Sequence, residues 1–489
     1  MDPYIQYMYS YPHKTAYGPL TGIRWEDYAG RLSGRENSLY IHIPFCRSKC
    51  GYCNLFSVAG QGEDLMEQYV EAMERQAAQW SAALDPRTVF ADLTLGGGTP
   101  LLLPERLLER VFRIASDAMG FEEQGHPVIV ETSPGQTTEE KLLLLKEHHV
   151  TRISMGVQSF QAEELGTIHR NHSPEQIERA LERIRSVGFA CVNLDLIYGI
   201  PGQTWESLRE SVDRAISFGA EELFVYPLYI KPDTYLFRKG VTRSADTYEM
   251  YRRIRQYLRE HGYIPYSMRR FVRADYAGGE AGNAISIGGA GATDSACENR
   301  GKRSTSCGFG NTVSIGCGGR SYIDHLHFCT PYAVRHSECM ANLQQYIDED
   351  DYREIRHGYL LSEEEQRRRF VIKNVLFDCG LSKEEYMAAF SRDVEADFPV
   401  LREWIARDYA LETEGVIRLT EEGFSLSDYL GPMLVSESYG RNTISGNTLA
   451  EKTAPSESIV PSERNMPPRT GGEHEGGKRP GGKRPGGGG

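Results

Sequence analysis

The sequence lacks the features of several protein classes. No apolar run approaches the roughly 20 residues that a bilayer-spanning helix needs, and the opening MDPYIQYMYSYPHK has no apolar signal-peptide core. Basic residues are also outnumbered. The chain has 55 Lys and Arg and 68 Asp and Glu, which gives a formal net charge of −13. This balance argues against nucleic acid or an anionic membrane as the main partner. We therefore expect a cytoplasmic protein without nucleic-acid or membrane partners.

Cysteine is scarce as well. Ten cysteines in 489 residues do not suggest a secreted disulfide scaffold, and reduced thiols suit an intracellular protein. Charged residues make up 25% and hydrophobic residues 40% of the chain, which is ordinary for a folded protein. The length allows two or three domains with a sizeable core.

Three of the cysteines stand close together. Cys46, Cys50 and Cys53 follow an apolar run in the spacing C-x3-C-x2-C. Thiolates are the soft ligands of iron–sulfur clusters, and one loop carrying three of them can hold three corners of a 4Fe-4S cube. The fourth iron then stays open for a small bidentate ligand. Taken alone, the spacing also allows a zinc knuckle or thiols that are merely buried.

From residue 38 onward, strand and helix patterns alternate. Apolar runs predict six strands, and helical spacing between them includes segments that start at Pro104 and Pro174. Parallel strands need such crossovers, so we predict an α/β fold with an open, partial (β/α)6 TIM-type barrel. In such barrels the chemistry lies at the carboxyl ends of strands. The predicted strands are 40–43, 88–95, 128–131, 152–157, 190–197 and 223–228.

Chemically useful residues follow these strands. Gly96-Gly97-Gly98-Thr99 follows the second strand, where small residues let backbone N–H groups approach a ligand. Carboxylates and an amide at strand ends can hold ribose hydroxyls and an amine, and an arginine can pair with a carboxylate. The residues of this kind are Glu131, Gln158, Arg170 and Asp195.

The flanks of the cysteine motif carry a resemblance. Tyr40-x-His42-Ile-Pro-Phe-Cys46, Cys50-x-Tyr52-Cys53 and the later GGGTP resemble the radical S-adenosylmethionine (SAM) superfamily, in the branch of oxygen-independent coproporphyrinogen oxidase. The resemblance implies a 4Fe-4S cluster and two SAM molecules. It assigns the catalytic and metal-binding roles to Cys46, Cys50 and Cys53. The cofactor-binding residues that it implies are Tyr40, Tyr52, Gly97, Gly98, Thr99, Glu131, Gln158, Arg170 and Asp195.

This branch holds porphyrinogen decarboxylases, non-catalytic haem chaperones and class C methyltransferases. The decarboxylases usually carry another cysteine two residues after the third, where this chain has Leu55. We therefore expect a class C enzyme of secondary metabolism, such as antibiotic biosynthesis. It would transfer a methyl or methylene unit to an sp2 carbon of an aromatic or heteroaromatic small molecule, giving C-methylation or cyclopropanation. The expected partners are that substrate, a reductant such as flavodoxin or ferredoxin, and a partner methyltransferase as a further candidate. A coproporphyrinogen III oxidase and a haem chaperone are the alternatives.

The predicted divisions are a Tyr-rich arm (1–35), the barrel (36–270), a sheet extension with a Gly-rich insertion (271–345), a small, mainly helical domain that covers the substrate (346–435) and a Gly/Pro-rich tail (436–489). Five further cysteines are about ten residues apart, which favours loop or core thiols over a second cluster. They are Cys297, Cys307, Cys317, Cys329 and Cys339. Glu206, Glu222 and Tyr229 are candidate bases.

Overall fold

A large mixed sheet organises the chain. The structure is a computed structural model that describes residues 4–5, 8, 10–277 and 310–436. Within these ranges thirteen strands form one sheet in the order β1-β15-β14-β13-β12-β2-β5-β6-β7-β8-β9-β11-β10. The described residues belong to one compact unit of residues 2–443.

The centre of the sheet is the predicted run of six parallel strands. Each strand pairs in parallel with the next in the sequence. Their residues are mostly buried, as expected when helices cover a parallel sheet. The partial (β/α)6 barrel is thereby confirmed. The strands are β2 (Glu36–Ile43), β5 (Val89–Gly97), β6 (Val128–Thr132), β7 (Arg152–Gln158), β8 (Cys191–Tyr198) and β9 (Glu222–Pro227).

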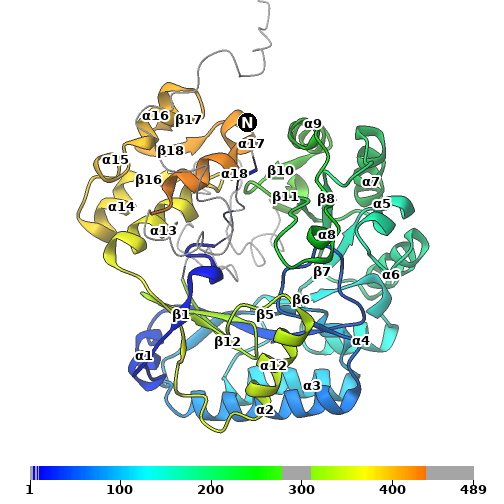
Figure 1. Ribbon diagram of the computed structural model, residues 1–489, viewed down its shortest axis with the longest axis vertical. Coiled ribbons are helices and arrows are strands. Elements are labelled where there is room, and N and C mark those ends of the chain that lie inside the picture. The colour runs from blue at the N-terminus through cyan, green and yellow to red at the C-terminus, as the bar shows by residue number, and fades with distance from the viewer. Residues whose placement is uncertain (1–3, 6–7, 9, 278–309, 437–489) are drawn as a thin grey trace, which may run out of the picture. The chain divides into compact units, whose positions relative to one another are not determined.

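Helices connect these strands and lie along the outer side of the sheet (Figure 1). Helix α6 shows why they begin where they do: Ser173 and Gln176 form a capping box, and Pro174 occupies the first helical position. The predicted starts at Pro104 and Pro174 are thus close to the observed ones. The helices are α2 (Glu63–Ser81), α3 (Glu105–Arg113), α4 (Glu139–Glu147), α5 (Ala162–Thr167), α6 (Pro174–Val187), α7 (Trp205–Ser217) and α9 (Thr247–Glu260).

Both edges of the barrel sheet are extended. Strand β12 (Asn311–Ile315) pairs in parallel with β2, and β13 (Arg320–Ile323), β14 (Leu326–Cys329), β15 (His357–Leu360) and β1 (Gly18–Pro19) follow as antiparallel strands. At the other edge, β11 (Arg270–Arg273) and β10 (Tyr263–Pro265) continue from β9. Strand β15 lies in this sheet, although its residues fall in the range predicted for the C-terminal helical domain.

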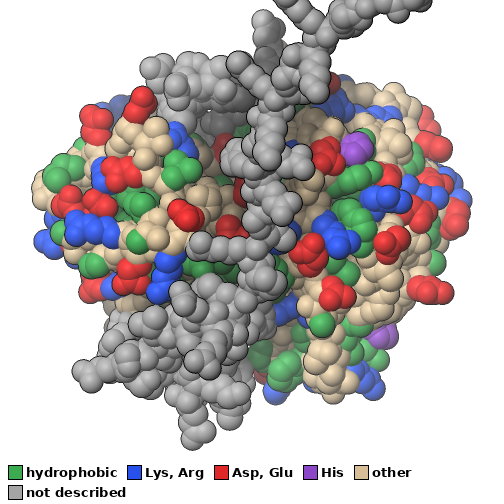
Figure 2. All heavy atoms as spheres, turned by 90° about the horizontal axis from the view of Figure 1, so that it is seen from above, with side chains coloured by type: hydrophobic (Ala, Val, Ile, Leu, Met, Phe, Trp, Pro, Cys, Tyr) green, Lys and Arg blue, Asp and Glu red, His purple; other side chains and the backbone are tan. Residues whose placement is uncertain are grey.

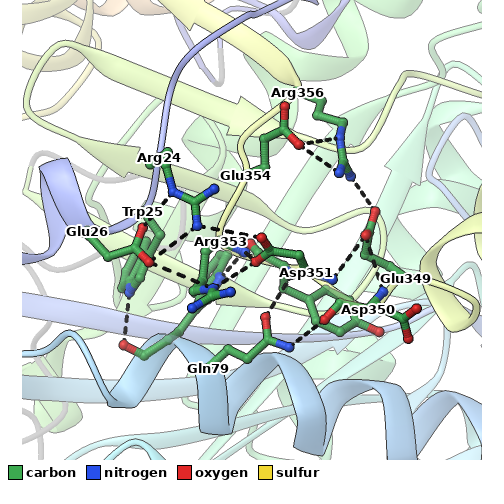
Figure 3. A network of polar contacts seen from close by, with 12 residues as sticks. Arg24, Trp25, Glu26, Gln79, Glu349, Asp350, Asp351, Arg353, Glu354 and Arg356 are labelled. Carbon is green, nitrogen blue, oxygen red and sulfur yellow. Dashed lines mark hydrogen bonds and ion pairs between the residues drawn. The ribbon is translucent and has the colours of Figure 1, made fainter.

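The N-terminal segment is fixed to the sheet by helix α1 (Glu26–Ala29) and its surroundings. Trp25 is fully buried, stacks on Trp80 and donates its indole N–H to the Trp80 carbonyl at 2.8 Å. Beside it, Arg24 forms an ion pair with Asp351 and Glu26 forms one with Arg353, in a network of charged residues that extends over 349–356 (Figure 3). These exposed pairs contribute little each, so the buried tryptophan pair supplies most of the attachment.

The C-terminal residues build a second apolar core. Trp404 and Tyr386 are among its largest buried side chains, and Met8 and Tyr11 from the N-terminal segment pack into it. The predicted hairpin around VIRL is present as β17 (Ala410–Thr413) and β18 (Val416–Leu419). The other elements are α13 (Glu363–Val375), β16 (Leu381–Ser382), α14 (Lys383–Phe390), α15 (Val394–Asp397), α16 (Val400–Ala406), α17 (Glu421–Ser425) and α18 (Ser427–Leu430).

The structure also bears on several remaining expectations. Among the described residues, no helix is long and apolar enough to cross a membrane. Cys317 and Cys339 are buried and Cys329 is partly buried, as core or loop thiols should be. Helix α12 (His336–Ile347) carries Cys339. Cys297, Cys307, the insertion and the tail from residue 437 lie outside the described residues.

Candidate functional site

The cysteine loop leaves the barrel directly after β2. Its first cysteine ends the short strand β3 (Phe45–Cys46), which pairs with β4 (Val58–Ala59). Gly51 holds the middle of the loop: its N–H donates to the Ile168 carbonyl at 3.0 Å, and its carbonyl accepts from Leu236 at 2.9 Å. A Cβ at Gly51 would lie 3.1 Å from the Ile168 oxygen. Glycine at this position therefore lets the loop lie tightly between α5 and helix α8 (Tyr235–Arg238).

Two of the thiols receive hydrogen bonds from predicted site residues. Thr99 donates its hydroxyl to Cys46 Sγ at 3.8 Å, and Arg170 donates Nη1 to Cys50 Sγ at 2.8 Å. Burial raises the pKa of Cys46 to about 11 and also raises the pKa of Cys53. Thiols of this kind are protonated without metal and release protons when a cluster binds. Hydrogen bonds to the sulfurs also help to set cluster potentials.

The donor set fits a cube-shaped cluster better than a single ion. Within the described ranges, no three His, Cys, Asp or Glu side chains converge on a single-ion site. A cluster does not require such convergence, because each thiolate binds a different iron. Three thiols on one loop, beside hydroxyl and guanidinium donors, are therefore compatible with a 4Fe-4S cluster. They do not support a zinc knuckle.

The end of β5 is shaped by its glycines. Gly97 has φ +114°, and its N–H donates to Glu131 Oε2 at 3.0 Å. A Cβ at Gly96 would lie 2.8 Å from the Glu131 carboxylate and 2.9 Å from the Tyr40 hydroxyl. A Cβ at Gly98 would lie 2.6 Å from the Phe45 carbonyl oxygen. These glycines bring the GGGTP segment against both the cysteine loop and Glu131.

Two partly buried carboxylates of the predicted site have raised pKa values. Burial raises the pKa of Glu131 to about 7, although the Gly97 N–H lowers it. Burial also raises the pKa of Asp195 to about 6, although a hydrogen bond that Asn193 donates at 2.9 Å lowers it. A cation in this part of the site would be attracted to either carboxylate and would favour its ionised form.

Gln158 and Arg170 meet at the end of β7. Gln158 is buried and has φ +74°, where the pairing of β7 with β8 is irregular. A non-glycine residue in this conformation costs on the order of 1–3 kcal/mol, which is typical of functional sites. Arg170 donates Nη2 to the Gly156 carbonyl at 2.5 Å, and a Cβ at Gly156 would lie 2.8 Å from both this nitrogen and Gln158 Nε2.

These contacts bring most of the predicted site residues to the side of the sheet where the parallel strands end. We call this side the cysteine edge. Asp195 differs in detail, because it lies inside β8 and does not end that strand. Tyr52 packs with Ile168, Ile197 and Leu236 and so anchors the cysteine loop.

The three candidate bases lie in different surroundings. Glu206 is exposed in the first turn of α7. Glu222 begins β9 at the opposite end of the strand, where Arg152 at 2.7 Å and Arg270 pair with it. Tyr229 donates its hydroxyl to Asp428 of α18. The sequence placed them near strand ends but could not show which end or which partner.

A second glycine-rich loop at this edge was not predicted as part of the site. It follows β12, and a Cβ at Gly318 would lie 2.6 Å from Phe56 and 2.8 Å from His42 Nε2. His42 is itself buried, bonds the Phe56 carbonyl at 3.0 Å, and has its pKa lowered to about 4 by burial. The available signal was a repeat in the sequence, since Ser314-Ile-Gly-Cys-Gly-Gly resembles the earlier Ser286-Ile-Gly-Gly-Ala-Gly. Only the pairing of β12 with β2 shows that the loop backs the cysteine loop.

Lys14 was also not predicted. It is 7% exposed, lies over the Tyr332 ring at 4.5 Å, and reaches the Asn54 carbonyl at 3.5 Å. Burial lowers its pKa to about 8, and repulsion from Arg320 adds to this. A buried ammonium beside another cation, next to the third cysteine, is a place where an anionic group would be stabilised.

Comparisons with known proteins agree with this geometry. The model of the radical SAM superfamily matches residues 40–215. The chain is 28% identical to the haem chaperone HemW of Bacillus subtilis over 399 residues, which cover 79% of this chain and 96% of that protein. It is 26% identical to the oxygen-independent coproporphyrinogen III oxidase of Pseudomonas aeruginosa over 403 residues, which cover 81% and 83%.

Among solved structures, the coproporphyrinogen III oxidase HemN of Escherichia coli superposes with a TM-score of 0.70 at 22% identity. The match covers 88% of this chain and 97% of that chain. At this identity the likeness shows the fold alone. It supports the radical SAM α/β fold that the sequence predicts.

The comparisons correct the predicted function. The expected class C methyltransferase or cyclopropane-forming enzyme of secondary metabolism is wrong, because the relatives are haem chaperones and coproporphyrinogen oxidases. The prediction gave too much weight to one missing cysteine after Cys53. The superfamily implies a 4Fe-4S cluster, SAM and a reductant. Residues 40–215 of this chain thus match the radical SAM superfamily, and the chain as a whole is similar to coproporphyrinogen oxidases and haem chaperones.

Proposed function

We propose that this protein is a radical SAM enzyme that oxidatively decarboxylates a carboxylate side chain of a porphyrinogen. The observation that carries the proposal is Lys14, a buried cation 3.5 Å from the carbonyl of Asn54, the residue after the third cysteine. Arg320 adds a second positive charge nearby. A substrate with propionate groups would offer such cations a carboxylate, and the similarity to coproporphyrinogen III oxidases supports this choice.

The residues of the edge divide into roles under this proposal. Cys46, Cys50 and Cys53 would hold the cluster. Glu131 would accept a hydrogen bond from the SAM amino group, since it already lies against the GGGTP backbone. Gln158 and Asp195 would hold ribose hydroxyls, and Arg170 would pair with the SAM carboxylate. The remaining predicted SAM contacts are Tyr40, Gly97, Gly98 and Thr99.

When bound, the reduced cluster and SAM supply a 5′-deoxyadenosyl radical. The substrate's propionate would lose one hydrogen atom to that radical and its carboxylate as CO2, leaving a vinyl group. One electron must pass to a one-electron acceptor for the step to balance. In this scheme Lys14 holds the carboxylate and so fixes which side chain faces the radical.

The test is anaerobic turnover of coproporphyrinogen III by the cluster-loaded protein with SAM and a reductant. We expect 5′-deoxyadenosine together with a product lighter by CO2 and two hydrogens for each vinyl group formed, and no S-adenosylhomocysteine. A conservative pair of variants probes the role of Lys14: Lys14→Met should raise KM more than it lowers kcat, and Lys14→Arg should retain most activity. Formation of 5′-deoxyadenosine with no loss of CO2 from this substrate would contradict the proposal.

A second SAM molecule is part of the proposal. Equilibrium binding to the cluster-loaded protein should then saturate at two SAM per chain. A stoichiometry of one would remove the second molecule and leave the decarboxylation chemistry in place.

A haem chaperone is the second candidate. It is favoured by the match over 96% of the Bacillus subtilis protein and by Leu55, which stands where decarboxylases usually carry a fourth cysteine. Titration with haem followed by absorption spectroscopy separates the two functions. Tight haem binding without SAM turnover on coproporphyrinogen III would select the chaperone.

A further inference from the structure

Helix α8 lies beside the cysteine loop at the protein surface. The N–H of Leu236 donates to the Gly51 carbonyl at 2.9 Å, and a Cβ at Gly51 would lie 3.2 Å from the Leu236 side chain. The preceding residue of the helix, Tyr235, packs edge-on against His169 with ring centroids 4.2 Å apart. The exposed residues of α8 therefore rim the loop that carries the three cysteines.

This rim is basic in a chain that is acidic overall. Arg47, Arg238 and Lys239 are exposed. The cysteine loop 46–57 contains no acidic residue, and Asp233 is the one acidic residue of 229–243. Asp233 is ion-paired with Arg335 at 2.7 Å. In contrast, acidic and basic side chains are interspersed over the described part of the face in Figure 2. The rim thus offers local positive charge that the net charge of −13 does not predict.

Large apolar side chains accompany the cations. Phe237 is 49% exposed and Leu55, two residues after Cys53, is 45% exposed. Tyr235 is 38% exposed. Exposed aromatic and aliphatic side chains within a polar rim are typical of protein interaction sites.

We propose that this surface, the α8 rim of Arg47, Leu55, Tyr235, Phe237, Arg238 and Lys239, docks a flavodoxin that reduces the cluster. Flavodoxins are small acidic proteins that expose an apolar edge of their flavin, which complements both the charge and the apolar residues of the rim. One-electron transfer falls steeply with distance, so the donor must bind where the cysteine loop meets solvent. The proposal rests on the cluster assigned under the proposed function, but not on the identity of the substrate.

The experiment measures reduction of the cluster itself. Reduced flavodoxin is mixed anaerobically with the cluster-loaded protein, and cluster absorption is followed by stopped flow at several salt concentrations. The variant Arg238→Glu/Lys239→Glu should be reduced on the order of tenfold more slowly than the wild type at low salt, and the two rates should converge at high salt. Phe237→Ala should slow reduction in a way that does not depend on salt.

Two controls separate docking from damage. Arg113→Glu reverses an exposed charge on α3 and should leave the rate unchanged. Reduced methyl viologen, a small cation that needs no docking surface, should reduce the Arg238→Glu/Lys239→Glu protein at least as fast as the wild type. Equal rates with flavodoxin for this variant and the wild type would overturn the proposal. Slow reduction by both donors would overturn it too, because the cluster would then be altered. Failure to turn over coproporphyrinogen III would leave these rates untouched.

Discussion

Two buried regions of this molecule are built in different ways. At the cysteine edge, partners come from consecutive strands and their loops, as when the N–H of Gly97, the last residue of β5, donates to Glu131 on β6. The second region, which we call the arm junction, joins four distant segments. They contribute Arg269 just before β11, Asp428 of α18, Tyr198 at the end of β8 and Tyr4 of the N-terminal segment. The cysteine edge follows from strand order, whereas the arm junction follows from how distant segments pack.

The arm junction shows what such packing must satisfy. Arg269 and Asp428 are an ion pair with both side chains almost fully buried, and Arg269 also donates to the Tyr198 hydroxyl at 3.2 Å. Tyr229 donates to the same carboxylate. Burying two charges is expensive unless each is paired and hydrogen-bonded. The two regions should therefore respond differently to substitution. Changes at the cysteine edge should abolish catalytic activity, whereas changes at the arm junction should lower the stability of the fold.

The largest effect is expected at the cysteine edge. Cys50→Ala removes one of three thiolates, so the cluster should be lost together with all SAM cleavage. Iron and sulfide content, the EPR spectrum of the reduced protein and 5′-deoxyadenosine formation measure this. Cys329→Ala is the matched control and should retain a full cluster. Retained SAM cleavage in Cys50→Ala would remove the radical mechanism itself.

The next effect is expected at the arm junction. Asp428→Ala leaves the buried Arg269 charge without its carboxylate, which should lower the free energy of unfolding by about 3–5 kcal/mol. Urea denaturation of the cluster-loaded protein measures it. The double variant Arg269→Met/Asp428→Ala should lose less than the single variant, because no unpaired charge remains. A double variant less stable than Asp428→Ala would show that the ion pair is not the source of the effect.

The smallest effect concerns pH at the cysteine edge. Burial raises the pKa of Glu131 to about 7 from the usual 4.5 of a glutamate. The folded protein without SAM keeps this proton up to about pH 7, whereas the unfolded chain loses it near 4.5. Stability should therefore fall as pH rises through this window, by up to about 3 kcal/mol, and then level off.

The variant Glu131→Gln cannot ionise, so its unfolding free energy should change less between pH 4.5 and 7 than that of the wild type. The difference between the two curves isolates Glu131, because Asp195 is present in both. Parallel curves would mean that Glu131 is already ionised in the folded protein.

Local patterns were sufficient for the central fold. The six parallel strands, the helices that begin near Pro104 and Pro174, and the hairpin at β17 and β18 all agree with the sequence to within a few residues. The physical reason is that apolar periodicity, proline positions and crossover geometry act over short stretches of chain. The strand-end rule then located Glu131, Gln158 and Arg170 at one edge, because parallel strands all end on the same side of a sheet.

Local sequence patterns were therefore enough to locate the cysteine loop and the polar residues near the ends of the barrel strands. Three placements came from the folded molecule alone: Lys14 reaches the carbonyl of the residue after the third cysteine, Glu222 lies at the opposite end of the strands, and Tyr229 donates to Asp428. Each of these contacts joins segments that are far apart in the chain. These contacts form through burial and charge pairing in the folded molecule, and the spacing of residues along the sequence does not predict them.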